Sequence, residues 1–357
     1  MLSLPDFDIG KRNPNLQLGG RVDLPRMQEG GLDAAFFAVF IDQDRLDQQH
    51  YRIARKNADQ MIDCIYRSIG EYSNIAEIVT TPQAAYEAKK SGHRAIFIGL
   101  ENGYPLGSDL SLIGHFFSRG IRYITLCHEA NNQICDSSGD SARYAGLNRF
   151  GIQVVQEMNR LGMMIDVSHL ADASVRDVLD HSRTPIIASH SCAHALCDHY
   201  RNLPDDLLRR IADGGGVIQV CFFSDFVKKP KPYPERDAAI EVLKKKYPNY
   251  AVLPSAEKQI AQMDWDRLDV DYVRELATIA DVVDHIDHIV RVAGIDHVGI
   301  GTDLDGGGEV QDLYNVSQMK NITRELVRRG YSDAEIEKIW GANFMRVFGD
   351  ILASAKG

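Results

Sequence analysis

Short apolar runs, separated by segments with helical periodicity, are the feature that most restricts the fold of this chain. Each run is bounded by glycine, proline or polar residues and is rich in β-branched residues, as is typical of strands buried on both faces. Seven runs have this character: residues 34–41, 95–100, 121–126, 163–167, 185–188, 216–223 and 298–300. Between them, segments such as 150–161 repeat apolar residues at helical spacing. The alternation predicts an α/β fold built on a parallel sheet.

Two parallel-sheet architectures compete for this pattern. An open nucleotide-binding sheet would carry a glycine-rich phosphate turn, and the glycines at 299–308 lack the required spacing. A (β/α)8 barrel of TIM type needs one more strand than the seven runs supply. We predict a single barrel domain over residues 1–357, with its first strand missing from this chain.

Residues 224–265 interrupt the alternation because they are polar, charged and contain prolines. We predict a solvated insertion here. A lid over the active end of the barrel is the alternative, since the segment follows a strand.

The composition excludes several classes of partner. A net charge of −10, without a long basic block, argues against nucleic acid. No stretch approaches the roughly 20 apolar residues of a membrane span. The six cysteines have no CxxC spacing, which predicts reduced thiols in a cytoplasmic protein. Assembly into a homo-oligomer is left open.

Five apolar runs lead into a residue that can bind a metal or transfer a proton. These residues are Glu101, His128, His169, His190 and Asp303. In a barrel, the carboxyl ends of the strands converge on one mouth, where active sites lie. Imidazoles together with carboxylates suit Zn²⁺ or a similar divalent ion.

Other polar residues are expected to lie outside this site. Asp166 is three residues from His169, so a regular strand turns it to the opposite face, and we predict a structural role. Residues 279–294 carry closely spaced Asp and His residues, but their apolar spacing predicts a helix with a solvated polar face. Three further histidines are also predicted not to be ligands: His181, His194 and His199.

Longer motifs around the strand-end residues resemble the membrane dipeptidase (renal dipeptidase) family of metallopeptidases. The resemblance runs from about Val22 to Phe348. It includes VDLPRMQEGGLDAAFFAVFI, IGLENG, YITLCHEANN, GMMIDVSHL, IIASHS, YRNLPDD, DHVGIGTDLDG and GANFMRVF. The resemblance implies hydrolysis of dipeptides that have a free C-terminal carboxylate, by a zinc-bound hydroxide.

The resemblance also implies roles for individual residues. Glu101 would bridge two zinc ions, and His169 and His190 would hold the second of them. Three residues would bind the substrate: His128 would polarise the scissile carbonyl, Arg201 would bind the terminal carboxylate, and Asp303 would handle the proton.

One motif of the family is absent. The family carries a His-x-Asp pair on its first strand, and residues 1–21 contain no histidine. The one H-x-D spacing, His285 to Asp287, falls in the predicted late helix. We expect a chain that starts after this strand, or a degenerate relative, with one zinc ion in place of two and weak or no activity. A mononuclear amidohydrolase and a non-catalytic binding protein remain the alternatives.

Overall fold

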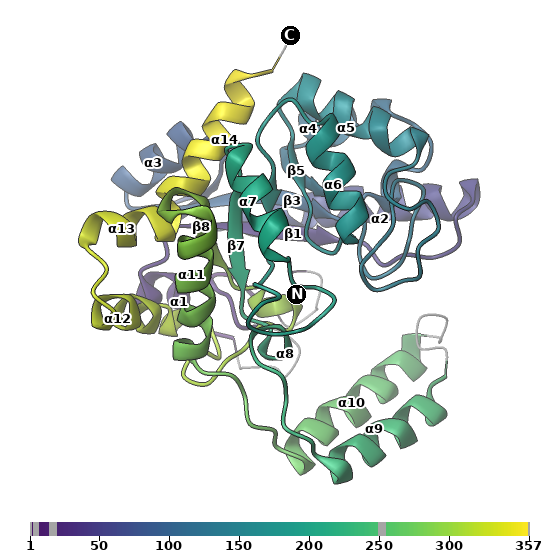
Figure 1. Cartoon of the computed structure of the whole chain (residues 1–357), viewed down its shortest axis with the longest axis vertical. Coiled ribbons are helices and arrows are strands. Elements are labelled where there is room, and N and C mark those ends of the chain that lie inside the picture. Colours follow the sequence, from purple (N-terminus) through teal and green to yellow (C-terminus); the bar gives the residue numbers. More distant parts are fainter. Residues whose placement is uncertain (1, 3–6, 14–19, 249–254, 356–357) are drawn as a thin grey trace.

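The computed structural model describes residues 2, 7–13, 20–248 and 255–355 (Figure 1). Its centre is a parallel sheet with the strand order β1-β3-β4-β5-β6-β7-β8. The short strand β2 pairs with the first residues of β3. The strands are β1 (Ala34–Phe40), β2 (Ala76–Ile78), β3 (Arg94–Glu101), β4 (Ile121–Thr125), β5 (Met164–Asp166), β6 (Ile187–Ala188), β7 (Val217–Cys221) and β8 (Val298–Gly301). Each of the seven predicted runs overlaps one of these strands. The sequence missed β2, which has three residues and no apolar run.

Helices follow the strands and cover the outer face of the sheet (Figure 1). They are α2 (Gln48–Gly70), α3 (Pro82–Lys90), α4 (Ser111–Ser118), α5 (Arg149–Leu161), α6 (Asp172–His181), α7 (Asp205–Asp213), α11 (Ile279–Ala293), α12 (Lys320–Arg328), α13 (Asp333–Glu337) and α14 (Asn343–Ala353), while α1 (Leu24–Gly30) precedes β1. Among the described residues, no helix is both long enough and apolar enough to cross a bilayer.

Local chemistry explains where these helices start and stop. At the start of α5, the Asn148 side chain accepts a hydrogen bond from the Gly151 N–H. The helix ends at Gly162, whose φ of 74° is easily adopted only without a side chain. Val154, Val155 and Met158 are buried on one face of α5, as their spacing predicts.

An aromatic cluster fills the interior of the curved sheet. The rings of Phe36 and Phe97 stack with centroids 4.8 Å apart, and Phe348 of α14 meets Phe97 at 5.5 Å. A side chain at Gly99 would collide with the Tyr123 ring. Gly99, two positions before Glu101, therefore has to lack a side chain because the Tyr123 ring occupies the space.

The sheet curls in the manner of a barrel but does not close. Within the described ranges, β1 pairs only with β3 and β8 only with β7, so one edge of each strand has no partner strand. A cavity of about 610 Å³ lies along these edges and is lined in part by Phe36, Ile300 and Trp340. The predicted barrel-type α/β fold is confirmed, and the gap lies where a closed barrel would hold a further strand.

The predicted insertion begins with α8 (Ser224–Val227) and continues into two helices, α9 (Pro234–Lys246) and α10 (Ser255–Asp271). Residues 249–254 of it lie outside the described residues. Figure 1 shows α9 and α10 side by side and apart from the sheet. Every residue of α9 is at least partly exposed, as expected of a solvated segment. Among the described residues, neither α9 nor α10 lines the cavity at the strand ends, so the structure gives no support to a lid.

One expectation about the late helix was wrong. Residues 279–293 do form a helix, α11, but its polar face is not simply solvated. His285 is buried, accepts a hydrogen bond from the Ala193 N–H and approaches the Val227 carbonyl at 2.8 Å. His288 lies 2.7 Å from the Asp205 carboxylate. These histidines are buried because α7, α8 and the loop after β6 pack against that face and supply partners for both rings.

Candidate metal centre and substrate pocket

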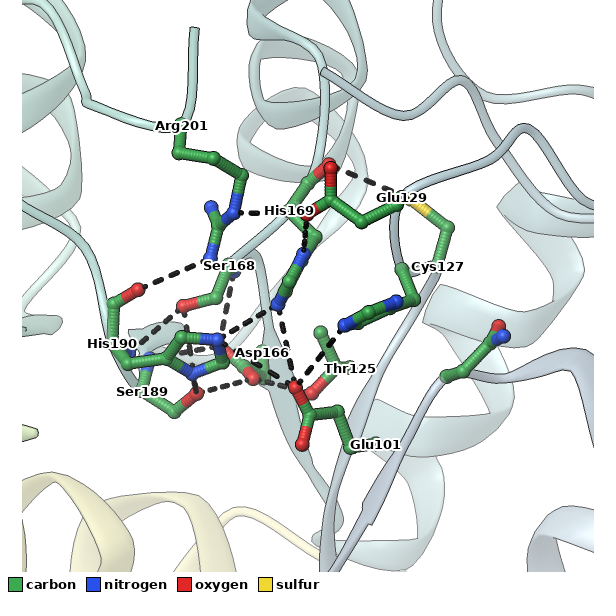
Figure 2. A network of polar contacts seen from close by, with 12 residues as sticks. Glu101, Thr125, Cys127, Glu129, Asp166, Ser168, His169, Ser189, His190 and Arg201 are labelled. Atoms are coloured by element: carbon green, nitrogen blue, oxygen red, sulfur yellow. Dashed lines mark hydrogen bonds and ion pairs between the residues drawn. The ribbon is translucent and has the colours of Figure 1, made fainter. Parts of the chain in front are cut away.

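Four of the predicted residues meet at the carboxyl ends of neighbouring strands, and Figure 2 labels three of them: Glu101, His169 and His190. Glu101 ends β3, and His128, His169 and His190 follow β4, β5 and β6 within three residues. The Nε2 atoms of His169 and His190 are 2.8 Å apart. Glu101 Oε1 lies 3.3 Å from Nε2 of His169, 3.6 Å from that of His190 and 3.9 Å from that of His128. The side chains therefore direct four donor atoms at one small volume.

The electrostatics of this cluster favour a cation. Burial by itself raises the pKa of Glu101, but its contacts with His169 and the other imidazoles lower it to about 2. Burial lowers the pKa of His128 to about 4 and that of His190 well below its usual value. An ionised carboxylate and neutral imidazoles are the protonation states that metal ligands require. The donor set therefore fits a divalent ion such as Zn²⁺.

Among the described residues, the group of acidic, histidine and cysteine side chains with donor atoms close enough to share an ion consists of Glu101, His128 and His169. The resemblance had placed His128 on the substrate rather than on the metal. His190 Nε2 lies nearer to Glu101 than His128 Nε2 does, which favours His190 as the third ligand. Both His128 and His190 lie at the site. Which of them binds the metal and which binds the substrate remains a prediction.

A buried polar chain orients His190. Its Nδ1 is 2.8 Å from the Ser189 hydroxyl, which donates to Asp166 Oδ2 at 2.6 Å. Asp166 is fully buried and also accepts a hydrogen bond from Thr125. Asp166 therefore lies behind the donor cluster and supports the His190 ring through the Ser189 hydroxyl.

His169 adopts an unusual backbone conformation. Its φ of 71° lies in the left-handed region, which is costly for a residue with a side chain. The Ser138 N–H donates to the His169 carbonyl at 2.9 Å, and the Ser137 hydroxyl donates to the same oxygen at 3.3 Å. The loop after β4 therefore fixes the backbone of His169, which lies in the loop after β5.

Asp303 follows β8 and lines the same cavity as Glu101. Burial and the nearby Glu101 charge raise the pKa of Asp303 to about 8. A pKa raised in this way favours the protonated carboxyl, which is the form that can act as an acid. Its φ of 54° is again left-handed, and a side chain at Gly306 would collide with its carboxylate.

Arg201 lies beside the cluster with few partners. It is 3% exposed, which rules out an ordinary surface ion pair. One of its terminal nitrogens donates to the His190 carbonyl at 3.4 Å, and its Nε is 3.5 Å from Glu129 Oε1 without forming a hydrogen bond. A buried guanidinium with unused donors is suited to a carboxylate ligand.

The structure adds a residue that the sequence reasoning missed. Glu129 contacts His169, Tyr200 and Arg201, and it lines a cavity of about 790 Å³ that also includes Asp303. Its position directly after His128 was the available signal, but adjacent residues in an extended segment normally point apart. His194 pairs with the exposed Asp198, whereas His199 stacks on Tyr200 and lines the same cavity as Glu129.

A parallel α/β sheet with imidazoles and a carboxylate at its strand ends defines a metal-dependent hydrolase. Comparison with known proteins is more specific. Residues 2–356 match the model of the membrane dipeptidase family (peptidase family M19), and the chain belongs to this family.

Individual relatives agree with this assignment. The chain is 33% identical to the dipeptidase tcpJ of Claviceps purpurea, over 99% of this chain and 75% of that protein. It is 30% identical to the dipeptidase aclJ of Aspergillus oryzae, over 94% of this chain and 71% of that protein. Its structure resembles that of the probable dipeptidase PvdM from Pseudomonas aeruginosa, with a TM-score of 0.84, 30% identity and coverage of 97% and 91% of the two chains.

The resemblance drawn from the motifs is thus confirmed. The chain is a dipeptidase of the metallopeptidase class. The identity and number of its metal ions, and the role of each residue, are matters for proposal.

Proposed function

We propose that the protein hydrolyses the peptide bond of dipeptides with a free C-terminal carboxylate, with zinc as its metal. The observation that carries this proposal is the convergence of donor atoms of Glu101, His169 and His190 within 3.6 Å of one another. Beside them lies the buried Arg201, whose guanidinium has unused donors. A metal centre and a carboxylate-binding cation in one cavity match a short peptide that ends in a carboxylate.

Glu101, His169 and His190 would hold the ion. A divalent ion at this position supplies Lewis acidity and lowers the pKa of water, so that hydrolysis can proceed at neutral pH. Among the described acidic residues, Glu101 and Asp303 are the two that line both this cavity and the one between β1 and β8. We therefore expect one tightly held ion in this chain, because a zinc site normally needs three or four donors.

The protein's own residues then bind and orient the substrate. Arg201 pairs with the terminal carboxylate and fixes the peptide in one direction. His128 donates a hydrogen bond to the scissile carbonyl oxygen. Asp303, whose pKa is raised by burial and by Glu101, gives its proton to the leaving amine nitrogen as the peptide bond breaks.

The test is hydrolysis of a set of dipeptides, their C-terminal amides and their N-acetylated forms, with zinc added in known ratios. The proposal expects turnover of free dipeptides, poor turnover of amides, and dependence on one equivalent of zinc. A mononuclear amidohydrolase would accept amides without a free carboxylate equally well. Zinc binding without turnover of any dipeptide would favour a non-catalytic relative.

A further inference from the structure

Glu129 connects the candidate metal ligand to the candidate carboxylate-binding residue. Its Oε1 lies 2.8 Å from His169 Nδ1, the ring nitrogen that faces away from Glu101, and 3.5 Å from Arg201 Nε. Its Oε2 accepts a hydrogen bond from the Tyr200 hydroxyl at 3.0 Å (Figure 2 shows Glu129 between His169 and Arg201). A single carboxylate thus touches three residues of the cavity.

The loop after β4 is shaped around this carboxylate. A side chain at Gly139 would lie 2.6 Å from Glu129 Oε2 and 2.6 Å from the Glu129 carbonyl oxygen, so only glycine leaves the space. The Ser137 hydroxyl, two residues away, donates to the carbonyl oxygens of both His128 and His169. The same loop therefore fixes the backbone of His169 and places the carboxylate that meets its ring.

An exposed acidic residue is usually of little consequence, because surface ion pairs contribute little. The Glu129 side chain is 42% exposed, but its partners are not: the side chains of His169 and Arg201 are 7% and 2% exposed. Glu129 reaches two buried polar side chains from the cavity wall, so the small contribution typical of surface ion pairs does not apply to it.

We propose that Glu129 is a positioning residue that fixes His169 with the proton on Nδ1 and the lone pair of Nε2 directed at Glu101 and His190. The inference rests on the proposed metal site. A carboxylate behind a ligating imidazole sets its tautomer, holds its plane and increases its basicity. Without this acceptor, the His169 proton could sit on Nε2 and block the donor atom.

Its position beside Arg201 gives Glu129 a second, separable effect. The negative charge partly neutralises the guanidinium that is proposed to receive the substrate carboxylate. Removing the charge while keeping an acceptor should therefore strengthen binding of the substrate carboxylate, whereas removing the whole side chain should also loosen His169.

Two substitutions separate these effects. Glu129→Gln keeps an oxygen that can accept from His169 Nδ1–H, and Glu129→Ala keeps none. Asp198→Asn serves as a matched control, because this carboxylate is 88% exposed on the loop that carries Arg201. Circular dichroism and thermal melting establish that all variants fold.

The first readout needs neither metal nor substrate. Nitrogen-15 NMR of histidine-labelled, metal-free protein, with the His169 signals assigned by His169→Gln, reports which ring nitrogen carries the proton. We expect Nδ1–H in the parent protein, in Glu129→Gln and in Asp198→Asn, and a mixture of tautomers in Glu129→Ala. An unchanged His169 tautomer in Glu129→Ala would overturn the proposal.

The second readout is zinc affinity, measured by competition with a chromogenic chelator. Glu129→Ala should bind zinc roughly 10–100-fold more weakly, the range found when outer contacts of a metal ligand are lost. Glu129→Gln should keep most of its affinity and show a lower KM with little change in kcat. Equal zinc affinity in the parent and in Glu129→Ala would contradict the positioning role. Failure of the parent to bind zinc would instead contradict the proposed function, and the tautomer measurement would still decide the role of Glu129.

Discussion

The Nε2 atoms of His169 and His190 lie 2.8 Å apart, although 21 residues separate them in the chain. The two histidines follow neighbouring parallel strands, β5 and β6, and each ring is held from behind through Nδ1, one by Glu129 and the other by Ser189. Two such nitrogens cannot both present lone pairs at this distance without a proton or a cation between them. The supports behind the rings keep them facing each other, which favours a metal at this point.

Glu101→Gln is expected to abolish both metal binding and hydrolysis. The amide keeps the size of the side chain but removes the charge next to Nε2 of His169 and of His190. Zinc affinity should fall by at least about 100-fold, more than the roughly 10–100-fold that outer contacts contribute. Elemental analysis after dialysis, together with dipeptide turnover, checks this. Near-normal zinc content in the variant would exclude Glu101 as a ligand.

Arg201→Lys is expected to raise KM with a smaller change in kcat. Lysine keeps the charge but loses the planar pair of donors, and a hydrogen bond between charged groups contributes about 1.5–3 kcal/mol, or about 10–150-fold in affinity. The comparison that matters is a dipeptide against its C-terminal amide. Amidation should impair the parent enzyme much more than the variant. Equal losses in both would mean that Arg201 does not contact the carboxylate.

Asp303→Asn is expected to lower kcat by about 10²–10⁴-fold, the usual contribution of a positioned acid or base. The raised pKa of Asp303, which follows from its burial and from Glu101, leaves a proton available at neutral pH that asparagine cannot donate. Substrates with a more acidic leaving amine, such as aminoacyl anilides that carry a carboxylate, should lose less. A uniform loss across leaving groups would point to a structural role.

The strands and most of the strand-end residues could be predicted because their signals are local. A strand buried on both faces is a continuous apolar run, and a polar residue at its end is conspicuous. Glu101, His128, His169, His190 and Asp303 were all identified in this way. Parallel topology then implies that such residues converge, since all carboxyl ends lie on one side of the sheet.

Other features depend on which loops meet, and that is not a local property. Glu129 acquires its role only when the loops after β4 and β5 come together, and its position after His128 does not by itself distinguish it from a solvated acid. His285 shows the reverse error: amphipathic spacing cannot tell an exposed histidine from one whose ring is buried and satisfied by distant backbone. The short β2 carries too few apolar residues to be recognised.

Acid should weaken the ion pairs that Glu325 forms with Arg328 and Arg329 at the end of α12. Hydrogen bonds from Arg328 and Arg329 lower the pKa of Glu325 to about 2 from its usual value of 4.5. Since the folded-state pKa is depressed, this stabilisation is fully present above pH 4.5 and is lost as the pH falls towards 2. Glu325→Gln should therefore lower Tm at pH 7, and the difference from the parent should shrink by pH 2.5.

Melting curves of the parent and the Glu325→Gln variant at pH 7, 4 and 2.5 test this. Glu71→Gln, an exposed carboxylate at the end of α2, is the control and should leave Tm nearly unchanged throughout. A Tm difference for Glu325→Gln that is independent of pH would show that the ion pairs do not stabilise the fold.

The facing edges of β1 and β8 should accept one further strand. Each has a backbone edge without a strand partner within the described ranges, and exposed edges of this kind favour unwanted pairing and aggregation. The cavity between them, of about 610 Å³, reaches Glu101 and Asp303. We expect that fusing a strand about as long as β1 upstream of Met1 closes the sheet, raises Tm and reduces aggregation.

If this strand ends in His-x-Asp, it should also add a second zinc ion and increase turnover. A fusion that ends in Gln-x-Asn is the matched control, which should gain stability but not the second ion. If neither fusion changes Tm or zinc content, the gap between β1 and β8 is not a strand site.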